Sequence, residues 1–169
     1  ADMRTRGFLM GATAGRTTLM GEGLQHQDGH SLVLASTVPA VQAYDPAFAY
    51  EVGAIVDAGI KRMYGGGMPD ETDVFYYITL YNENYEMPEL PDREGIAEAI
   101  VEGLYKWADA PDGEGFKPAT IMFSGSAQGA AREADNELSE HYGVGAELWS
   151  ATSYKALREE GLSAERHNR

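Results

Sequence analysis

The stretch best equipped for chemistry covers residues 21–30 and reads GEGLQHQDGH. It holds two histidines, two acids and three glycines in ten residues. Glycine lets a loop backbone approach a ligand closely, and histidine gives and takes protons near neutral pH. His26 and His30 are therefore candidates for substrate binding or proton transfer at the edge of an active site. A polar, glycine-rich stretch is also typical of a simple turn, and composition alone leaves that alternative open.

The segments on either side of this loop predict the elements that position it. Phe8–Met10 is a short apolar run that predicts a strand leading into the loop. Ser31–Ser36, directly after the loop, has the length of a strand or of a helical turn. Val38–Tyr44 predicts a further strand, because proline is tolerated at a strand start and the residues after it follow a strand pattern.

A helix and a buried strand are predicted next. Asp45-Pro46 predicts a helix start, because Asp can cap free N–H groups and Pro suits the first helical turn. Apolar residues at spacings of three and four continue to Met63 and predict one buried helix face. Val74–Leu80 is a near-continuous apolar and aromatic run, typical of a strand covered on both faces in a parallel sheet. Tyr81–Tyr85 follows at its carboxyl end, where α/β proteins commonly place ligand groups, although these residues equally suit a polar turn.

The remainder of the chain predicts a second α/β unit. Arg93–Trp107 predicts a helix, and residues 109–116 are rich in turn formers, which predicts a linker. After it, strands and helices are predicted to alternate at Ala119–Phe123, Ala127–Tyr142, Ala146–Ser150 and onward from a cap at Ser153. Such alternation predicts a parallel sheet. Gly125–Gly129 lacks the spacing of a dinucleotide fingerprint and is interpreted as strand-to-helix packing.

The composition excludes several classes of function. The 169 residues include 27 acidic and 13 basic ones, for a net charge of −14 at pH 7. That charge disfavours nucleic acid, whose phosphates need a basic surface, and it disfavours an anionic membrane. No apolar run approaches the roughly 20 residues that a membrane-spanning helix needs. The absence of cysteine excludes disulfides, thiolate catalysis and Cys-ligated zinc, and fits a cytoplasmic location.

The two ends of the sequence suggest a piece of a longer polypeptide. The chain opens with ADMRTR, without an initiator methionine or a signal peptide. It stops within a stretch of helical character, at ERHNR. The function of this piece therefore need not be the function of the parent protein.

Four blocks of the sequence carry a family resemblance. They are RGFLMGATAGRTTLMGEGLQHQDGHS, AYDPAFAYEVGAIVDAGIKRMYG, VFYYITLYNENYEMP and GVGAELWSATSYKALREEG, in that order along the chain. Together they closely resemble the homodimeric type of pyruvate dehydrogenase E1 component, and the wording is nearest to actinobacterial members. The resemblance runs over essentially the whole chain.

This resemblance implies a fold and a domain organisation. The family is related to transketolases, and its subunits carry α/β domains with parallel sheets in three layers, of the thiamine diphosphate-binding type. This chain would hold such domains in part. Residues 1–108 would be the carboxyl-terminal half of the pyrimidine-binding domain, 109–116 a linker, and 117–169 the first part of the C-terminal domain.

The resemblance also implies site residues. The histidine of the family's G-L-Q-H loop projects toward the reactive carbon of the cofactor, and it corresponds to His26. Its implied role is to orient pyruvate or the intermediate and to assist proton transfer. Gln25 and His30 complete the expected substrate-binding set. The implied cofactors are thiamine diphosphate and Mg²⁺, but the family's catalytic glutamate and metal-binding motif would lie upstream of Ala1, so no cofactor or metal ligand is expected in this chain.

The implied activity is oxidative decarboxylation of pyruvate, with transfer of the acetyl group to a lipoyl-bearing dihydrolipoyl acyltransferase. The implied assembly is a homodimer of E1 subunits, with no nucleic acid or membrane partner. Without the upstream glutamate, the isolated chain is expected to be inactive. Two alternatives stay open: a catalytically inactive fragment or interaction module of the same fold, and another enzyme of the transketolase superfamily.

Overall fold

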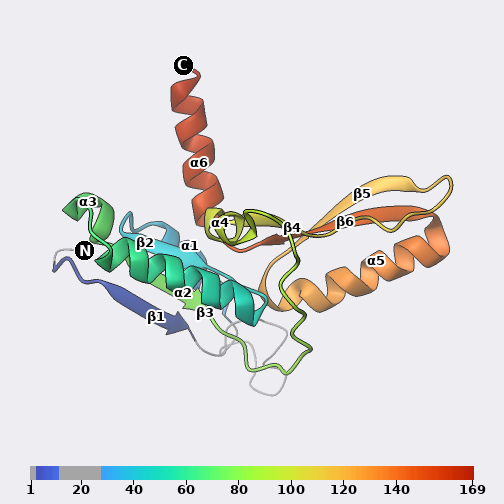
Figure 1. Ribbon diagram of the computed structural model, residues 1–169, viewed down its shortest axis with the longest axis horizontal. Coiled ribbons are helices and arrows are strands. Elements are labelled where there is room, and N and C mark those ends of the chain that lie inside the picture. The colour runs from blue at the N-terminus through green and yellow to red at the C-terminus, as the bar shows by residue number, and fades with distance from the viewer. Residues whose placement is uncertain (1–2, 12–27) are drawn as a thin grey trace.

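The structure, a computed structural model, describes residues 3–11 and 28–169, with the side chains of all of these except residues 69 and 70. It consists of two three-stranded sheets with helices packed against them (Figure 1). The first half of the chain contains β1 (Gly7–Gly11), α1 (Ser31–Ser36), β2 (Val41–Tyr44), α2 (Ala49–Tyr64), α3 (Pro69–Thr72) and β3 (Phe75–Thr79). The second half contains α4 (Ile96–Glu102), β4 (Leu104–Ala108), β5 (Lys117–Phe123), the 3-10 turn η2 (Gly125–Ala127), α5 (Gln128–Tyr142), β6 (Val144–Ala151) and α6 (Tyr154–His167).

The first sheet is parallel, with β3 between β1 and β2. This confirms the three strands predicted for the first half and their parallel sheet, and it places the aromatic run at the centre. Ser31–Ser36, for which the sequence left two alternatives, forms the short helix α1. The carboxyl ends of β2 and β3 therefore lie next to each other, with Tyr44 opposite Ile78.

Helix α2 covers one face of this sheet through a close approach at Gly59. A Cβ at that position would lie 2.8 Å from the ring of Phe8 and 3.1 Å from that of Tyr76. Ile55 and Met63, one turn away on either side, are completely buried. The predicted apolar face of this helix is confirmed.

The start of α2 differs from the prediction. The helix begins at Ala49, and Asp45 does not cap it. Its first turn is instead closed by Glu51, whose carboxylate accepts hydrogen bonds from the backbone N–H groups of Ala47 and, at 3.1 Å, Phe48. A glutamate at the third helical position can reach back to the cap in this way, and its charge suits the positive end of the helix dipole. Asp45 is thus free to turn its side chain toward other partners.

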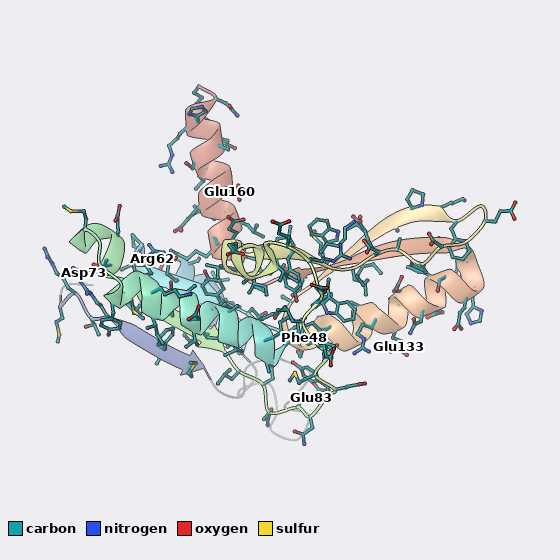
Figure 2. All side chains as sticks on the ribbon, viewed as in Figure 1. Phe48, Arg62, Asp73, Glu83, Glu133 and Glu160 are labelled. Carbon is teal, nitrogen blue, oxygen red and sulfur yellow. The ribbon has the colours of Figure 1, made fainter. Side chains whose placement is uncertain are left out.

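The second sheet has the order β4-β6-β5. The parallel β5-α5-β6 unit and the Ser153 cap of α6 are confirmed, and the Ser153 hydroxyl accepts a hydrogen bond from the Ala156 N–H at 3.1 Å. Figure 1 shows α6 projecting away from both sheets, and its residues from Glu160 onward are exposed (Figure 2). None of the helices in the described ranges has the length and apolar character needed to cross a bilayer.

The predicted helix over Arg93–Trp107 is wrong in its second half. α4 ends at Glu102, Gly103 adopts a φ of +109°, and Leu104–Ala108 forms β4, which pairs antiparallel with β6. The carbonyl of Gly103 accepts hydrogen bonds from the N–H groups of Thr152 and Ser153. Only glycine adopts this backbone conformation readily. The β6 residues that pair with β4 lie 40 to 47 residues further along the chain, so a local periodicity could not reveal the strand. The second sheet therefore begins before the predicted linker at 109–116.

The two sheets meet around the buried carboxylate of Glu51. Its side chain accepts hydrogen bonds from the hydroxyls of Tyr105 on β4 and Ser150 on β6, each at 2.7 Å. The Tyr105 hydroxyl in turn accepts one from Tyr50 at 2.8 Å, because its own proton is donated to Glu51. Burial raises the pKa of Glu51 above its ordinary value, and the four hydrogen bonds that it accepts oppose that rise. A single side chain thus joins the start of α2 to two strands of the other sheet.

An aromatic cluster surrounds this joint. Figure 2 shows Phe48 at the start of α2, beside the amino-terminal end of α5. Its ring lies 5.6 Å from that of Trp107 on β4 and 6.1 Å from that of Phe123 on β5. Aromatic pairs at such distances add to the stabilisation from burial alone. The contact between the two halves is therefore apolar at its rim and hydrogen-bonded at Glu51.

We expect Glu51→Gln to destabilise the chain by about 1 to 3 kcal/mol, because the amide keeps only one of the two acceptor oxygens, and its NH2 group meets either the two backbone N–H groups or the two hydroxyls. The pKa of Glu51 is raised on folding, so its protonated form contributes stability that is present below pH 4.5 and is lost as the pH rises through the folded value. The stability difference between wild type and variant should therefore shrink as the pH rises. Urea unfolding at a series of pH values measures it.

The exposed Glu133 on α5 provides the matched control for this experiment. Glu133→Gln should change the free energy of unfolding by less than about 0.5 kcal/mol. If the free energies of unfolding of Glu51→Gln and wild type differed by the same amount at every pH, the raised pKa of Glu51 would be contradicted.

Gly125 allows a second close contact between the halves. Its φ is +50°, and its N–H donates to the backbone carbonyl of Asp45 at 3.2 Å. A Cβ there would collide with the Tyr81 hydroxyl and lie 2.9 Å from the Asp45 carboxylate.

We expect Gly125→Ala to lower the free energy of unfolding by at least about 2 kcal/mol, through the strained backbone and the clash. Gly129→Ala, in α5 with open space around it, should instead stabilise the chain. If Gly125→Ala and Gly129→Ala changed the thermal unfolding temperature equally, a close contact at Gly125 would be refuted.

Candidate functional site

A cavity of about 570 Å³ lies at the carboxyl ends of β2 and β3. Such a volume is typical of sites for small ligands, and the carboxyl edge of a parallel sheet is where α/β proteins bind them. The first half contributes α1, the turn before it, and the ends of β2 and β3 to the wall; the second half contributes η2 and the first turns of α6. The cavity therefore depends on the contact between the two sheets.

His30 lies at this cavity, where it precedes α1 as the N-cap residue. The carboxylate of Asp28 accepts hydrogen bonds from the N–H groups of His30, at 3.3 Å, and Ser31, at 3.1 Å, and from the Ser31 hydroxyl. This turn fixes the backbone of His30 at the mouth of the cavity and leaves its side chain exposed. His26 and Gln25, the other two predicted substrate-binding residues, lie outside the described residues, and their place in the site stays a prediction.

The floor of the cavity is formed by Asp45, Thr79 and Tyr81. One carboxylate oxygen of Asp45 accepts hydrogen bonds from the Thr79 hydroxyl, at 2.5 Å, and from the Tyr81 hydroxyl. Burial raises the pKa of Tyr81 far above its ordinary value, and the neighbouring Asp45 charge raises it further. Tyr81 is therefore a hydrogen-bond donor at any physiological pH, and it holds the Asp45 carboxylate in place.

The second half of the chain adds two cations and several hydroxyls. Lys155 is buried, and its ammonium group lies 2.6 Å from the Glu159 carboxylate and 3.3 Å from the Pro39 carbonyl. Arg158, one turn further along α6, is exposed and also lines the cavity. Ser124 and Ser126 contribute from the turn between β5 and α5. The wall thus combines both signs of charge with hydroxyl groups on a largely apolar surface.

Sequence reasoning found part of this site and missed the rest. Tyr81, interpreted as either a ligand group or a turn residue, lines the cavity. Asp45 was interpreted as a helix cap, and Gly125–Gly129, which contains Ser126, as packing between strand and helix. The missed signal for Asp45 was its place directly after β2, which runs parallel to β3 and ends beside it. No local signal could have brought Arg158 to the same place.

The described residues do not fit a magnesium diphosphate site. Within residues 3–11 and 28–169, no group of three or more His, Asp or Glu side chains could hold a metal ion. Mg²⁺ takes oxygen ligands in octahedral geometry, and carboxylates supply them together with phosphates and waters. In this part of the chain the arrangement can bind and orient a small polar ligand.

Comparisons with known proteins agree with one another. The family model of the pyruvate dehydrogenase E1 component middle domain matches residues 1–88, just over half of the chain. The pyruvate dehydrogenase E1 component of Mycolicibacterium smegmatis is 50% identical over 167 residues, which cover 99% of this chain and 17% of that protein. The corresponding proteins of Mycobacterium tuberculosis and Escherichia coli K12 are 48% and 46% identical, over 98% and 99% of this chain. The chain spans less than a fifth of the length of these relatives.

Solved structures show the same fold at lower sequence identity. A transketolase from Pichia stipitis matches with a TM-score of 0.62 and 17% identity, over 92% of this chain and 20% of that one. A transketolase from Leishmania mexicana matches with a TM-score of 0.59, over 82% of this chain and 18% of that one. The parallel α/β architecture is therefore of the transketolase type, as predicted. From the match of the family's middle-domain model over residues 1–88, this chain belongs to the pyruvate dehydrogenase E1 component family.

Proposed function

We propose that this chain is part of a pyruvate dehydrogenase E1 subunit, which decarboxylates pyruvate oxidatively and transfers the acetyl group to a lipoyl-bearing dihydrolipoyl acyltransferase. One observation carries the proposal: nearly the whole chain aligns at 42 to 50% identity with pyruvate dehydrogenase E1 components. The likeness to transketolases, at 17% identity, supports the fold alone. It therefore gives no ground for a sugar-transferring activity.

His26 is the residue to which we assign the chemistry of this chain. It orients pyruvate or the intermediate by hydrogen bonding and assists proton transfer during acetyl transfer. Gln25 and His30 are assigned to substrate binding beside it. The position of His30 at the cavity supports this assignment, since Asp28 fixes the turn only two residues after His26 in the sequence.

The other parts of the active site belong to regions outside this chain in our proposal. Thiamine diphosphate, which supplies the carbanion chemistry when bound, and Mg²⁺ are assigned to upstream segments of the subunit. Residues 1–108 and 117–169 are assigned to the pyrimidine-binding and C-terminal domains, with a linker at 109–116. The subunit would act in the cytoplasm as a homodimer. The alternative, an inactive module that binds only a partner subunit, is decided by the two experiments below.

The first experiment replaces His26 in the full-length polypeptide. We expect His26→Ala to lower kcat/KM for pyruvate by at least about a hundredfold, the scale of a lost acid–base group. His30→Ala should raise KM with a smaller effect on kcat, because His30 is assigned to binding. His141→Ala, exposed at the end of α5, is the control and should leave both parameters unchanged. Full activity of the His26 variant would refute its catalytic assignment.

The second experiment tests the chain by itself. Purified and supplied with thiamine diphosphate, Mg²⁺ and pyruvate, the 169-residue chain should release no carbon dioxide, because the glutamate that activates the cofactor is assigned to an upstream segment. The full-length polypeptide in the same assay is the positive control. Turnover by the chain alone would overturn the division of the active site that we propose.

A further inference from the structure

Arg158 is an exception among the basic residues that the structure describes. Most of the others pair with a carboxylate, as Lys155 does with Glu159 and Lys106 does with Glu147 at 2.5 Å. Arg62 and Arg166 donate to backbone carbonyls, and Arg132 lies over the ring of Trp107. Within 3–11 and 28–169, Lys117 and Arg158 are the only basic residues whose side chains make no hydrogen bond, ion pair or ring contact. Of these two, Arg158 lines the cavity and Lys117 does not.

An unpaired cation is unexpected in this chain. Acidic residues outnumber basic ones by 27 to 13, so a surface arginine is expected to find a carboxylate partner nearby. The guanidinium group offers planar pairs of donors that match the oxygens of a carboxylate or a phosphate. Arg158 is therefore available for an anion that enters the cavity from solvent.

The neighbours of Arg158 on the second half of the chain suit the same anion. Lys155, three residues before it on α6, adds a second positive charge to the wall. The Ser124 hydroxyl, in the turn after β5, makes no hydrogen bond within the described ranges and can donate one to an oxyanion. Both cations come from α6, and since Lys155 is paired with Glu159, Arg158 supplies the unpaired positive charge on that side of the cavity.

The two carboxylates at the cavity belong to other elements and are already hydrogen-bonded. Asp28 lies in the turn before α1 and accepts hydrogen bonds from Ser31, the first residue of that helix. Asp45 lies at the floor of the cavity and accepts them from Thr79 and Tyr81. Neither pairs with Arg158, and each is held in place by donors of its own element or its neighbouring strand. The remaining lining includes Leu32, Val33, Ala43 and Ala127, which suit an apolar ligand body.

We propose that this cavity binds a small anion with an apolar body, whose carboxylate or phosphate group pairs with Arg158. Bound there, the ligand contacts α1 and the ends of β2 and β3 on one half and α6 on the other. A ligand that binds only this arrangement stabilises it against separation of the halves. The proposal concerns the α6 side of the cavity and is independent of the assignment of His26.

The test uses the full-length polypeptide and two probes that share one body, benzoate and phenyl phosphate, with neutral benzyl alcohol as a third. Isothermal titration calorimetry gives the affinity of each. We expect at least one anion to bind, benzyl alcohol to bind at least about tenfold more weakly, and Arg158→Gln to weaken the anion by a similar factor. Lys117→Gln removes the other unpaired cation, outside the cavity, and should change nothing. Whichever of the two probes binds more tightly identifies the head group.

Arg158→Lys gives a second measurement, because it keeps the charge and loses the planar fork; an affinity between those of wild type and Arg158→Gln is expected. Thermal unfolding of each variant with and without the probe reports the stabilisation separately from affinity. The proposal is overturned if neither anion binds, if benzyl alcohol binds as well as the anions, or if Arg158→Gln binds them unchanged. A loss of dehydrogenase activity in any variant, with anion binding intact, bears on the proposed function and not on this site.

Discussion

The arrangement of this molecule depends on one buried carboxylate. Glu51 is completely buried, and no cation lies among the groups that hydrogen-bond to it. Burying an isolated charge is costly, and here the cost is offset by donors from both halves: two backbone N–H groups at the start of α2 and the hydroxyls of Tyr105 and Ser150. Because the donors on β4 and β6 belong to the second sheet, separating the halves would strip the carboxylate of two partners. The joint therefore specifies one relative placement of the sheets.

That placement creates the cavity. The Asp45–Phe48 segment is held from three directions: Glu51 binds its N–H groups, the Asp45 N–H donates to Thr152, and the Tyr85 hydroxyl donates to the carbonyl of Ala47. Asp45 is thereby fixed at the end of β2, where Gly125 can approach it closely. Ser124 and the start of α6 then face the ends of β2 and β3. A polar joint at one point and a ligand-sized cavity at another are consequences of the same contact.

The division of the chain follows from this contact as well. Each sheet has three strands, and hydrogen bonds between the halves run through loops and strand ends, such as Ser153 to Ala43 and Asp45 to Thr152. In the family to which the chain belongs, the relatives are more than five times longer. The chain contains His30 and the floor of a cavity, and the assignment of catalysis to His26 rests on its family resemblance.

The sequence by itself determined the elements whose signals are local. The aromatic run at β3, the apolar face of α2, the Ser153 cap and the β5-α5-β6 unit all follow from residue types at fixed spacings, and the long blocks of resemblance identified the family. Tertiary structure decided the rest. Residues 104–108, which form β4, were predicted as helix because the strand with which they pair, β6, is distant in sequence. Asp45 was predicted as a helix cap because the sequence did not show that Glu51 closes the first turn of α2. Arg158 reached the cavity only through the packing of α6 against the first half. These features depend on which groups meet across the chain, and a hydrogen bond to a distant partner outweighs the modest preference of a local pattern.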